Sequence, residues 1–249
     1  LFGIVVKQHE AVFETAELAF SCAAFFGCCW ALTRPYWGSA LAGFACGASI
    51  LCSNLLVGAT VLVGCLMSHI LVRGIGDTAR KIFTTVAVAF ITFGLWPLVA
   101  YLLAGVVAGD YFNLWAQRQI QIVGFFDPQE ILWFVKHFIW YLCPAWPFAF
   151  WAIWMWRKNL TITHIALPLS FCCAWLIGFI LSSDVAAETL LSVTIAPLCV
   201  LASFGLMACN RSTKSMLELF SVAIFTLALT GVWAYFIAWT LGFPPKMHW

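Results

Sequence analysis

The stretch IFTTVAVAFITFGLWPLVAYLLAGV, residues 82–106, decides the fold class of this chain. It carries no charged side chain and exceeds the roughly 20 apolar residues that a helix needs to cross a bilayer. Comparable apolar runs, separated by polar breaks, lie near residues 14–32, 38–53, 56–72, 131–156, 163–182, 187–208 and 216–242. These runs predict an all-α, polytopic transmembrane helical bundle of about eight spans.

The composition supports this class and excludes others. Of 249 residues, 64% are hydrophobic and 9% are charged, too few polar side chains to coat a water-soluble globule. A net charge of +2 without a basic run gives no case for a nucleic-acid partner. The eleven cysteines form no C-x-x-C motif, so we interpret them as small side chains in helix interfaces. No repeat or linker divides residues 1–249, which we expect to form one transmembrane domain.

The charged residues predict an orientation. Eight of the twelve basic residues fall in alternate loops, which the positive-inside rule assigns to the cytoplasm. Seven of the ten acidic residues then lie outside, on an acidic face where we expect the functional site. The eight basic residues are Arg34, Arg73, Arg80, Lys81, Arg157, Lys158, Arg211 and Lys214, and the seven acidic ones are Glu10, Glu14, Asp110, Asp127, Glu130, Asp184 and Glu188.

The loop 107–130 is the only long one. Within it, Trp115, Ile122 and Phe126 favour one face of a helix, and polar residues fall elsewhere. We therefore predict a short interfacial helix over residues 111–126, lying on the outer membrane surface and ended by Asp127-Pro128.

The segment KQHEAVFETAEL, residues 7–18, carries the strongest candidate site. On a helix, Glu10, Glu14 and Glu17 share one stripe, with His9 beside it. Three carboxylates in one stripe repel one another, so a cation, a metal ion or a proton between them would stabilise the arrangement. The alternative is a solvated helix start, whose first turn favours negative charge. We choose Glu14 as the catalytic residue and as the metal ligand, and His9 and Glu10 as substrate-binding residues.

Arg118 and Lys136 are cations predicted at headgroup height on the outer side, where a lipid phosphate would lie. With their neighbours Gln119 and His137 they are candidate substrate-binding residues. The alternative for the cations is contact with anionic headgroups, and for His137 an interfacial position without a catalytic role. The Trp-rich helix of residues 140–158 is interpreted as structural.

A family resemblance follows from the order of several segments. HEAVFETAEL, DYFNLWAQRQIQ, PAWPFAFWAIWMWRK, LPLSFCCAWLIGFILSSDVAAETLLSVTIAPLCVLASFGL and the closing LGFPP resemble the latter part of a bacterial GT-C glycosyltransferase. The chain is most similar to the aminoarabinose transferase and protein mannosyltransferase group.

The resemblance implies transfer of a sugar from a polyprenyl-phosphate donor to an envelope lipid or glycan acceptor, at the outer face of the bacterial inner membrane. It implies a divalent metal ion in some members, and a role for Glu14, because an acidic residue opens the corresponding span in the family. The family's first outer loop should precede Leu1, so we expect a fragment of a larger membrane domain. Ala187 stands where the family usually has an Arg before its Glu, which here is Glu188, and this departure leaves the activity open.

Two other classes of function remain open at this point. A cation- or proton-coupled transporter would also place carboxylates at a helix mouth, but it should carry ionisable groups at mid-span. A structural subunit of a membrane complex would need no site at all.

Overall fold

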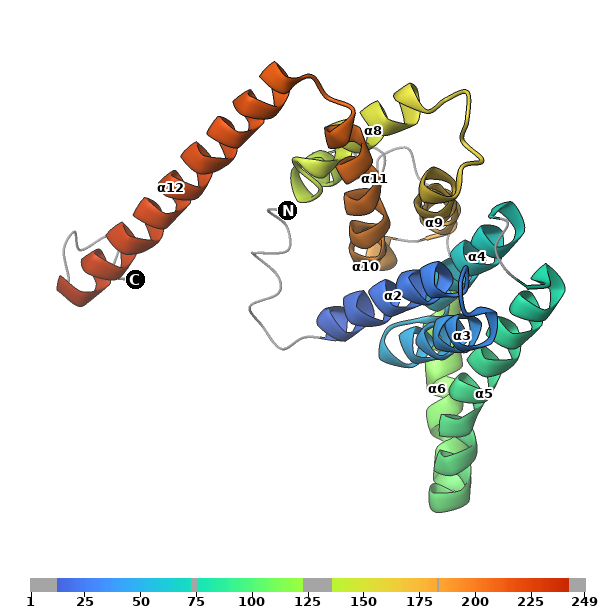
Figure 1. The fold of residues 1–249 in the computed structure, drawn as a ribbon. Helices are drawn as coiled ribbons and strands as arrows, with labels where there is room; N and C mark the ends of the chain where they lie inside the picture. Colours follow the sequence, from blue (N-terminus) through green and yellow to red (C-terminus); the bar gives the residue numbers. More distant parts are fainter. Residues whose placement is uncertain (1–12, 73–75, 123–135, 183, 242–249) are drawn as a thin grey trace. The chain divides into compact units, whose positions relative to one another are not determined.

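The computed structural model describes residues 13–72, 76–122, 136–182 and 184–241 (Figure 1). Over these ranges the chain is helical, with no strand. The helices belong to two compact units, Leu1–Gly205 and Leu206–Trp249, which are described separately. The helices of the first unit are α2 (Phe13–Trp30), α3 (Pro35–Cys52), α4 (Leu55–Leu71), α5 (Thr78–Ala104), α6 (Val106–Ile122), a helical stretch over 136–141, α8 (Ala145–Met155), α9 (Thr163–Ile180), α10 (Asp184–Val193) and α11 (Ile195–Met207). The last two residues of α11 belong to the second unit. The second unit is built on α12 (Arg211–Leu241).

Three described helices are long and apolar enough to cross a membrane, namely α5, α9 and the Arg211–Thr240 part of α12. The all-helical class predicted from the sequence is thereby confirmed, and these three helices are consistent with a membrane protein. The number of eight spans stays a prediction.

Two predicted spans are interrupted. The 131–156 run breaks at residues 142–144, and the 187–208 run breaks at Thr194. Pro144 is the last residue of the first break, and Pro197 lies three residues after the second. Proline lacks the N–H that would continue the helical hydrogen bonds and crowds the preceding turn, so each run divides into two shorter helices.

Local sequence signals determine where α3, α4 and α5 begin and where α5 ends. Pro35 occupies the first turn of α3, where its missing N–H has no helical partner to lose. Asn54 caps α4, because its Oδ1 accepts a hydrogen bond from the Val57 amide at 2.8 Å. Asp77 caps α5 in the same way, accepting from the Ala79 amide at 3.2 Å. Gly105, at φ 56°, makes the turn from α5 to α6.

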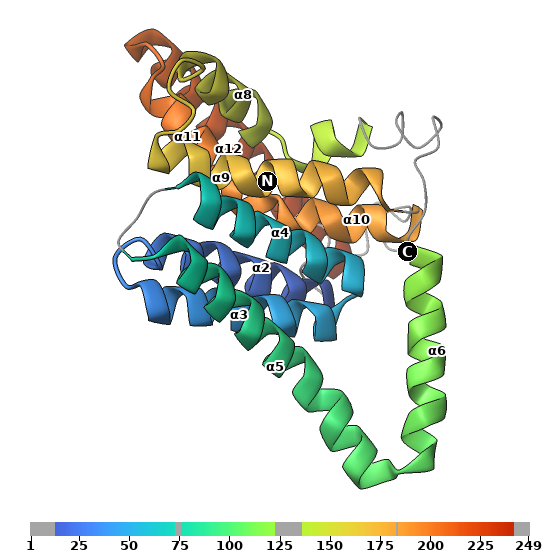
Figure 2. The same ribbon diagram turned by 90° about the vertical axis from the view of Figure 1, so that its right-hand side faces the viewer.

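Small residues on two faces of α3 allow its neighbours to approach closely. A Cβ atom at Gly38 would overlap the backbone of Ala31, the residue directly after α2. On the other face, Gly43 and Gly47 form a G-x-x-x-G pair, and a Cβ at Gly47 would lie 2.7 Å from the Ala89 carbonyl oxygen of α5. Helix α3 therefore packs against both α2 and α5, with the helix backbones close together (Figures 1 and 2).

A second pair, α4 and α9, packs by the same principle, with Gly178 against the side chain of Thr60. Helix α10 contacts α9, α4 and α2, and also reaches α6. In Figure 2 the upper end of α6 lies beside the right-hand ends of α4 and α10. We call the end of the first unit at which α2 begins, α3 ends and α4 begins the Glu17 end, and the opposite end the Lys81 end.

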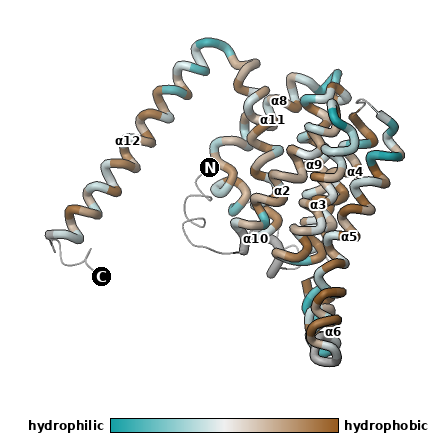
Figure 3. Tube along the Cα trace, turned by 60° about the horizontal axis from the view of Figure 1, so that its bottom comes forward, coloured by the Kyte–Doolittle hydropathy of each residue, from teal (hydrophilic) through white to brown (hydrophobic). Residues whose placement is uncertain are grey.

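The second half of α5 carries large apolar side chains on its surface. Leu102 is 73% exposed and Leu103 is 84% exposed. Hydrophobic residues continue to the end of this helix in Figure 3, whereas hydrophilic ones gather at its start. Exposed apolar surface of this kind is expected of a helix that contacts lipid.

Candidate functional site

The first component of the candidate site is a buried carboxylate. Glu17 is the fifth residue of α2 and is fully buried, at 0% exposure. It lies close enough to Cys52, the last residue of α3, for the two groups to interact electrostatically. A carboxylate removed from water needs a polar or cationic partner, so the alternative of a solvated helix start does not hold for Glu17. The backbone of Glu14 lies in the first turn of the same helix, three residues earlier.

The turn between α3 and α4 is the second component. Asn54 donates a hydrogen bond from Nδ2 to the Ser53 hydroxyl at 3.1 Å while its Oδ1 caps α4. The Leu55 amide donates to Oε1 of Gln119 at 2.8 Å. This contact joins residues 64 positions apart and fixes the C-terminal part of α6 against the Glu17 end.

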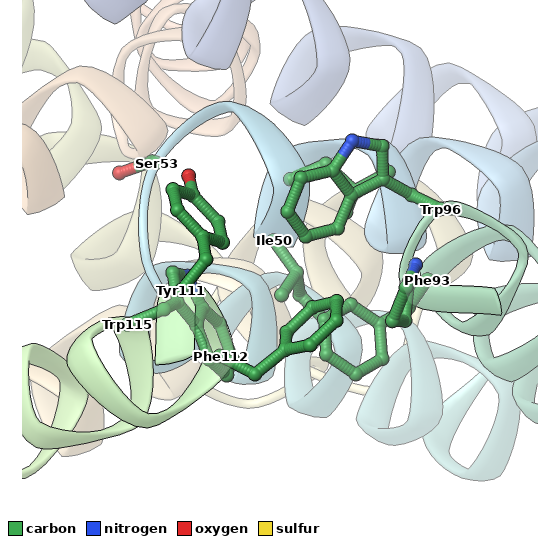
Figure 4. Close-up of a pocket in the computed structure, with 9 residues that line it drawn as sticks. Ile50, Ser53, Phe93, Trp96, Tyr111, Phe112 and Trp115 are labelled. Carbon is green, nitrogen blue, oxygen red and sulfur yellow. The ribbon is translucent and has the colours of Figure 1, made fainter. Parts of the chain in front are cut away.

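The third component is a pocket of about 360 Å³ between the end of α3, the middle of α5 and the first half of α6 (Figure 4). Aromatic rings supply most of its wall, and the Ser53 hydroxyl supplies a polar group. The rings of Trp96 and Phe112 meet edge to face at 5.5 Å, and Phe93 and Trp115 lie 5.9 Å apart. The lining residues are Ile50, Leu51, Ser53, Phe93, Trp96, Pro97, Tyr111, Phe112 and Trp115.

The carboxylate and the pocket are neighbours across the end of α3. Cys52 is close to Glu17, and the residues on either side of it, Leu51 and Ser53, line the pocket. Arg118 lies on α6 one turn beyond Trp115, and its side chain is exposed. The Glu17 end therefore combines an aromatic pocket, a buried carboxylate and an exposed cation.

Helix α10 adds acidic residues at the same end. Asp184 is its first residue and Glu188 lies one turn later. The structure does not describe their side chains, but the helix that carries them packs on α2, α4 and α6. Elements that the sequence predicted to share the outer side are thus packed together.

The predicted site residues are distributed as follows. His9 and Glu10 lie outside the described residues, and of Glu14 only the backbone position in α2 is described. Gln119 has a structural contact at the start of α4. Lys136 is exposed and His137 half-buried in the short helix 136–141. That helix is held against α9, because Phe138 stacks on Trp175 with ring centroids 5.7 Å apart.

The predicted interfacial helix overlaps α6. Helix α6 begins at Val106, five residues before the predicted start, and the predicted end at Asp127-Pro128 lies outside the described residues. Its position along a membrane surface stays a prediction, as does the metal-binding role of Glu14. Within the described ranges, no three His, Cys, Asp or Glu side chains are grouped to hold a metal ion.

The pocket itself was not predicted from the sequence. Its walls come from three helices, and only the contacts between them bring the rings to one place. One signal was available, namely two aromatic clusters, Phe93 to Trp96 and Tyr111 to Trp115, on either side of the turn at Gly105. A helical hairpin at Gly105 brings two such clusters face to face.

Comparison with protein-family models, with curated proteins and with solved structures finds no match to this chain.

Proposed function

We propose that this chain is, or is part of, a GT-C-type membrane glycosyltransferase of the bacterial inner membrane. It transfers a sugar from a polyprenyl-phosphate donor to a lipid or glycan acceptor of the cell envelope, at the outer face. The observation that carries the proposal is the meeting of an aromatic pocket, a buried carboxylate and an exposed arginine at the Glu17 end.

The pocket suits the lipid part of such a donor. Apolar and aromatic walls bind a prenyl chain through burial of hydrocarbon surface, and the few polar groups orient the ligand. Arg118 stands one turn from the pocket wall at Trp115. A guanidinium in that position can hold a phosphate by two parallel hydrogen bonds and stabilise the negative charge that develops when the sugar leaves.

The carboxylates of α2 suit the acceptor part of the reaction. Glu14, in the first turn of α2, is assigned the role of activating the acceptor group or of holding a divalent metal ion. Glu17, one turn deeper, is assigned a positioning role, because a fully buried carboxylate is held by its surroundings. The reaction forms a bond from the acceptor oxygen to the sugar and breaks the bond from the sugar to the polyprenyl phosphate.

The depth of the buried carboxylate argues against the transporter alternative. Glu17 lies four residues beyond the start of an 18-residue helix, about 6 Å along its axis at 1.5 Å per residue. A transporter site is expected near the centre of the bilayer. The structural-subunit alternative offers no reason for a pocket beside a buried carboxylate.

Photo-crosslinking with an undecaprenyl phosphate analogue that carries a benzophenone near its phosphate tests the proposal. We expect labelled peptides from α5 and α6, with labelling reduced by Trp115→Leu and by Arg118→Gln. Trp154→Leu and Arg157→Gln, both at exposed residues near the end of α8, are the matched controls and should leave labelling unchanged. Equal labelling of the Arg118→Gln variant and the unmodified protein would remove the phosphate site from the proposal.

A further inference from the structure

A lysine is buried at the Lys81 end, and no carboxylate in the described part of the chain forms an ion pair with it. Lys81 lies in the first turns of α5 and is 4% exposed. Among the described residues its ammonium group has neither a hydrogen-bond nor an ion-pair partner. An ammonium group on so buried a side chain is largely withdrawn from water, so an anion beside it would stabilise it.

A small pocket adjoins this lysine. It has a volume of about 100 Å³, and its wall includes Lys81, Arg80, Thr84, Asp77 and Gly76. The Cε atom of Lys81 is 3.7 Å from the place where a Cβ on Gly76 would stand, so the end of the lysine side chain lies at this wall. The absence of a side chain at Gly76 leaves that space open.

Among the described residues that line the pocket, one positive charge is left uncompensated. The Asp77 carboxylate is already used, because it caps α5 through the Ala79 amide and lies 3.9 Å from Nε of Arg80. Arg80 and Lys81 contribute two positive charges and Asp77 one negative charge, a balance of +1. The amide groups at the start of α5 add a partial positive charge. His69, which interacts electrostatically with Lys81, has its Nε2 3.2 Å from the Thr85 hydroxyl oxygen.

The neighbouring aromatic residues indicate a membrane interface. Tyr36 lines the pocket and is 60% exposed, and Trp37 beside it is 69% exposed. Tyrosine and tryptophan concentrate at the headgroup level of a bilayer. Phe83, on α5 two residues beyond Lys81, is 74% exposed and extends the apolar surface toward the hydrocarbon region.

We infer that the pocket at Lys81 binds the phosphodiester group of an anionic phospholipid. A phosphodiester carries one negative charge, which matches the balance of the lining. The Lys81 ammonium contacts the phosphate from inside the pocket and the Arg80 guanidinium from its mouth, and the acyl chains follow the exposed side of α5. The site is distinct from the proposed glycosyl-transfer site and does not depend on it.

The unfolding midpoint of the purified full chain in detergent tests this inference. Phosphatidylglycerol, phosphatidylcholine and inorganic phosphate are titrated separately, since a ligand that binds only the folded state raises the midpoint by mass action. Phosphatidylglycerol should give a saturable rise. Phosphatidylcholine should give little or none, because its phosphodiester is accompanied by a quaternary ammonium that Arg80 and Lys81 repel. Inorganic phosphate should also give little or none, because it has no acyl chains to contact α5. Lys81→Met should weaken the phosphatidylglycerol effect roughly tenfold, as expected for loss of one charge-assisted hydrogen bond.

Two variants make the result specific. Lys158→Met removes another cation, in the exposed connection after α8, and should leave the response intact. Lys81→Met should unfold without lipid at or above the temperature of the unmodified protein, because an uncompensated buried charge has been removed. Full protection by inorganic phosphate alone, equal losses in the two variants, or no response to phosphatidylglycerol would each overturn the assignment.

Discussion

At the scale of single residues, the glycines of α3 make the most local prediction. A Cβ at Gly43 would overlap the Thr85 carbonyl oxygen, which is backbone and cannot rotate away. Gly43→Ala should lower the free energy of unfolding by about 1–3 kcal/mol, the usual range for overpacking. Gly94→Ala is the matched control, because a Cβ there meets nothing within 4 Å. Denaturant unfolding of both variants in detergent checks this, and equal stabilities would show that α3 and α5 do not pack closely.

The sequence predicts the carboxylate stripe of α2 but not the burial of one member. The spacing of Glu14 and Glu17 on a helix follows from periodicity alone. The burial of Glu17 depends on tertiary packing, since Cys52 at the end of α3, which lies close to it, is more than 30 positions away. The metal role of Glu14 and the roles of His9 and Glu10 stay predictions.

At the scale of helices, the contact between α6 and α4 can be tested directly. Gln119→Met removes the acceptor for the Leu55 amide and keeps the side-chain length, so that amide should exchange its hydrogen faster, with a stability loss of about 1 kcal/mol. Gln117→Met changes an exposed residue of the same helix and is the control. Hydrogen-exchange mass spectrometry of the α4 peptide reports the difference. Unchanged exchange in Gln119→Met would show that α6 is not attached at this point.

Helix positions were predictable where apolar runs end at strong local signals. The predicted 38–53 and 56–72 runs correspond to α3 and α4, because Pro35 and Asn54 mark their starts. The internal breaks were missed because the runs on both sides of Pro144 and Thr194 are equally apolar. Hydropathy measures transfer into lipid and carries no information on continuity of the helical hydrogen bonds.

At the scale of the whole molecule, the charge distribution predicts the orientation. Alkaline phosphatase fused after Gly105 should be active, because the α5–α6 turn is predicted outside. A fusion after Lys158 should be inactive, because that loop is predicted cytoplasmic. Green fluorescent protein fused at the same two positions should give the opposite pattern. Activity of the enzyme fused after Lys158 would reverse the orientation and remove the outer site.

The most direct test of the proposed function measures sugar transfer from a radiolabelled polyprenyl-phosphate sugar to envelope lipid by membranes containing the full-length protein. We expect transfer with the unmodified chain and a loss of at least about a hundredfold with Glu14→Gln, the lower range for removal of a general base. Glu218→Gln, on α12 in the second unit, should transfer at the normal rate. Normal transfer by Glu14→Gln would contradict the proposed catalytic role.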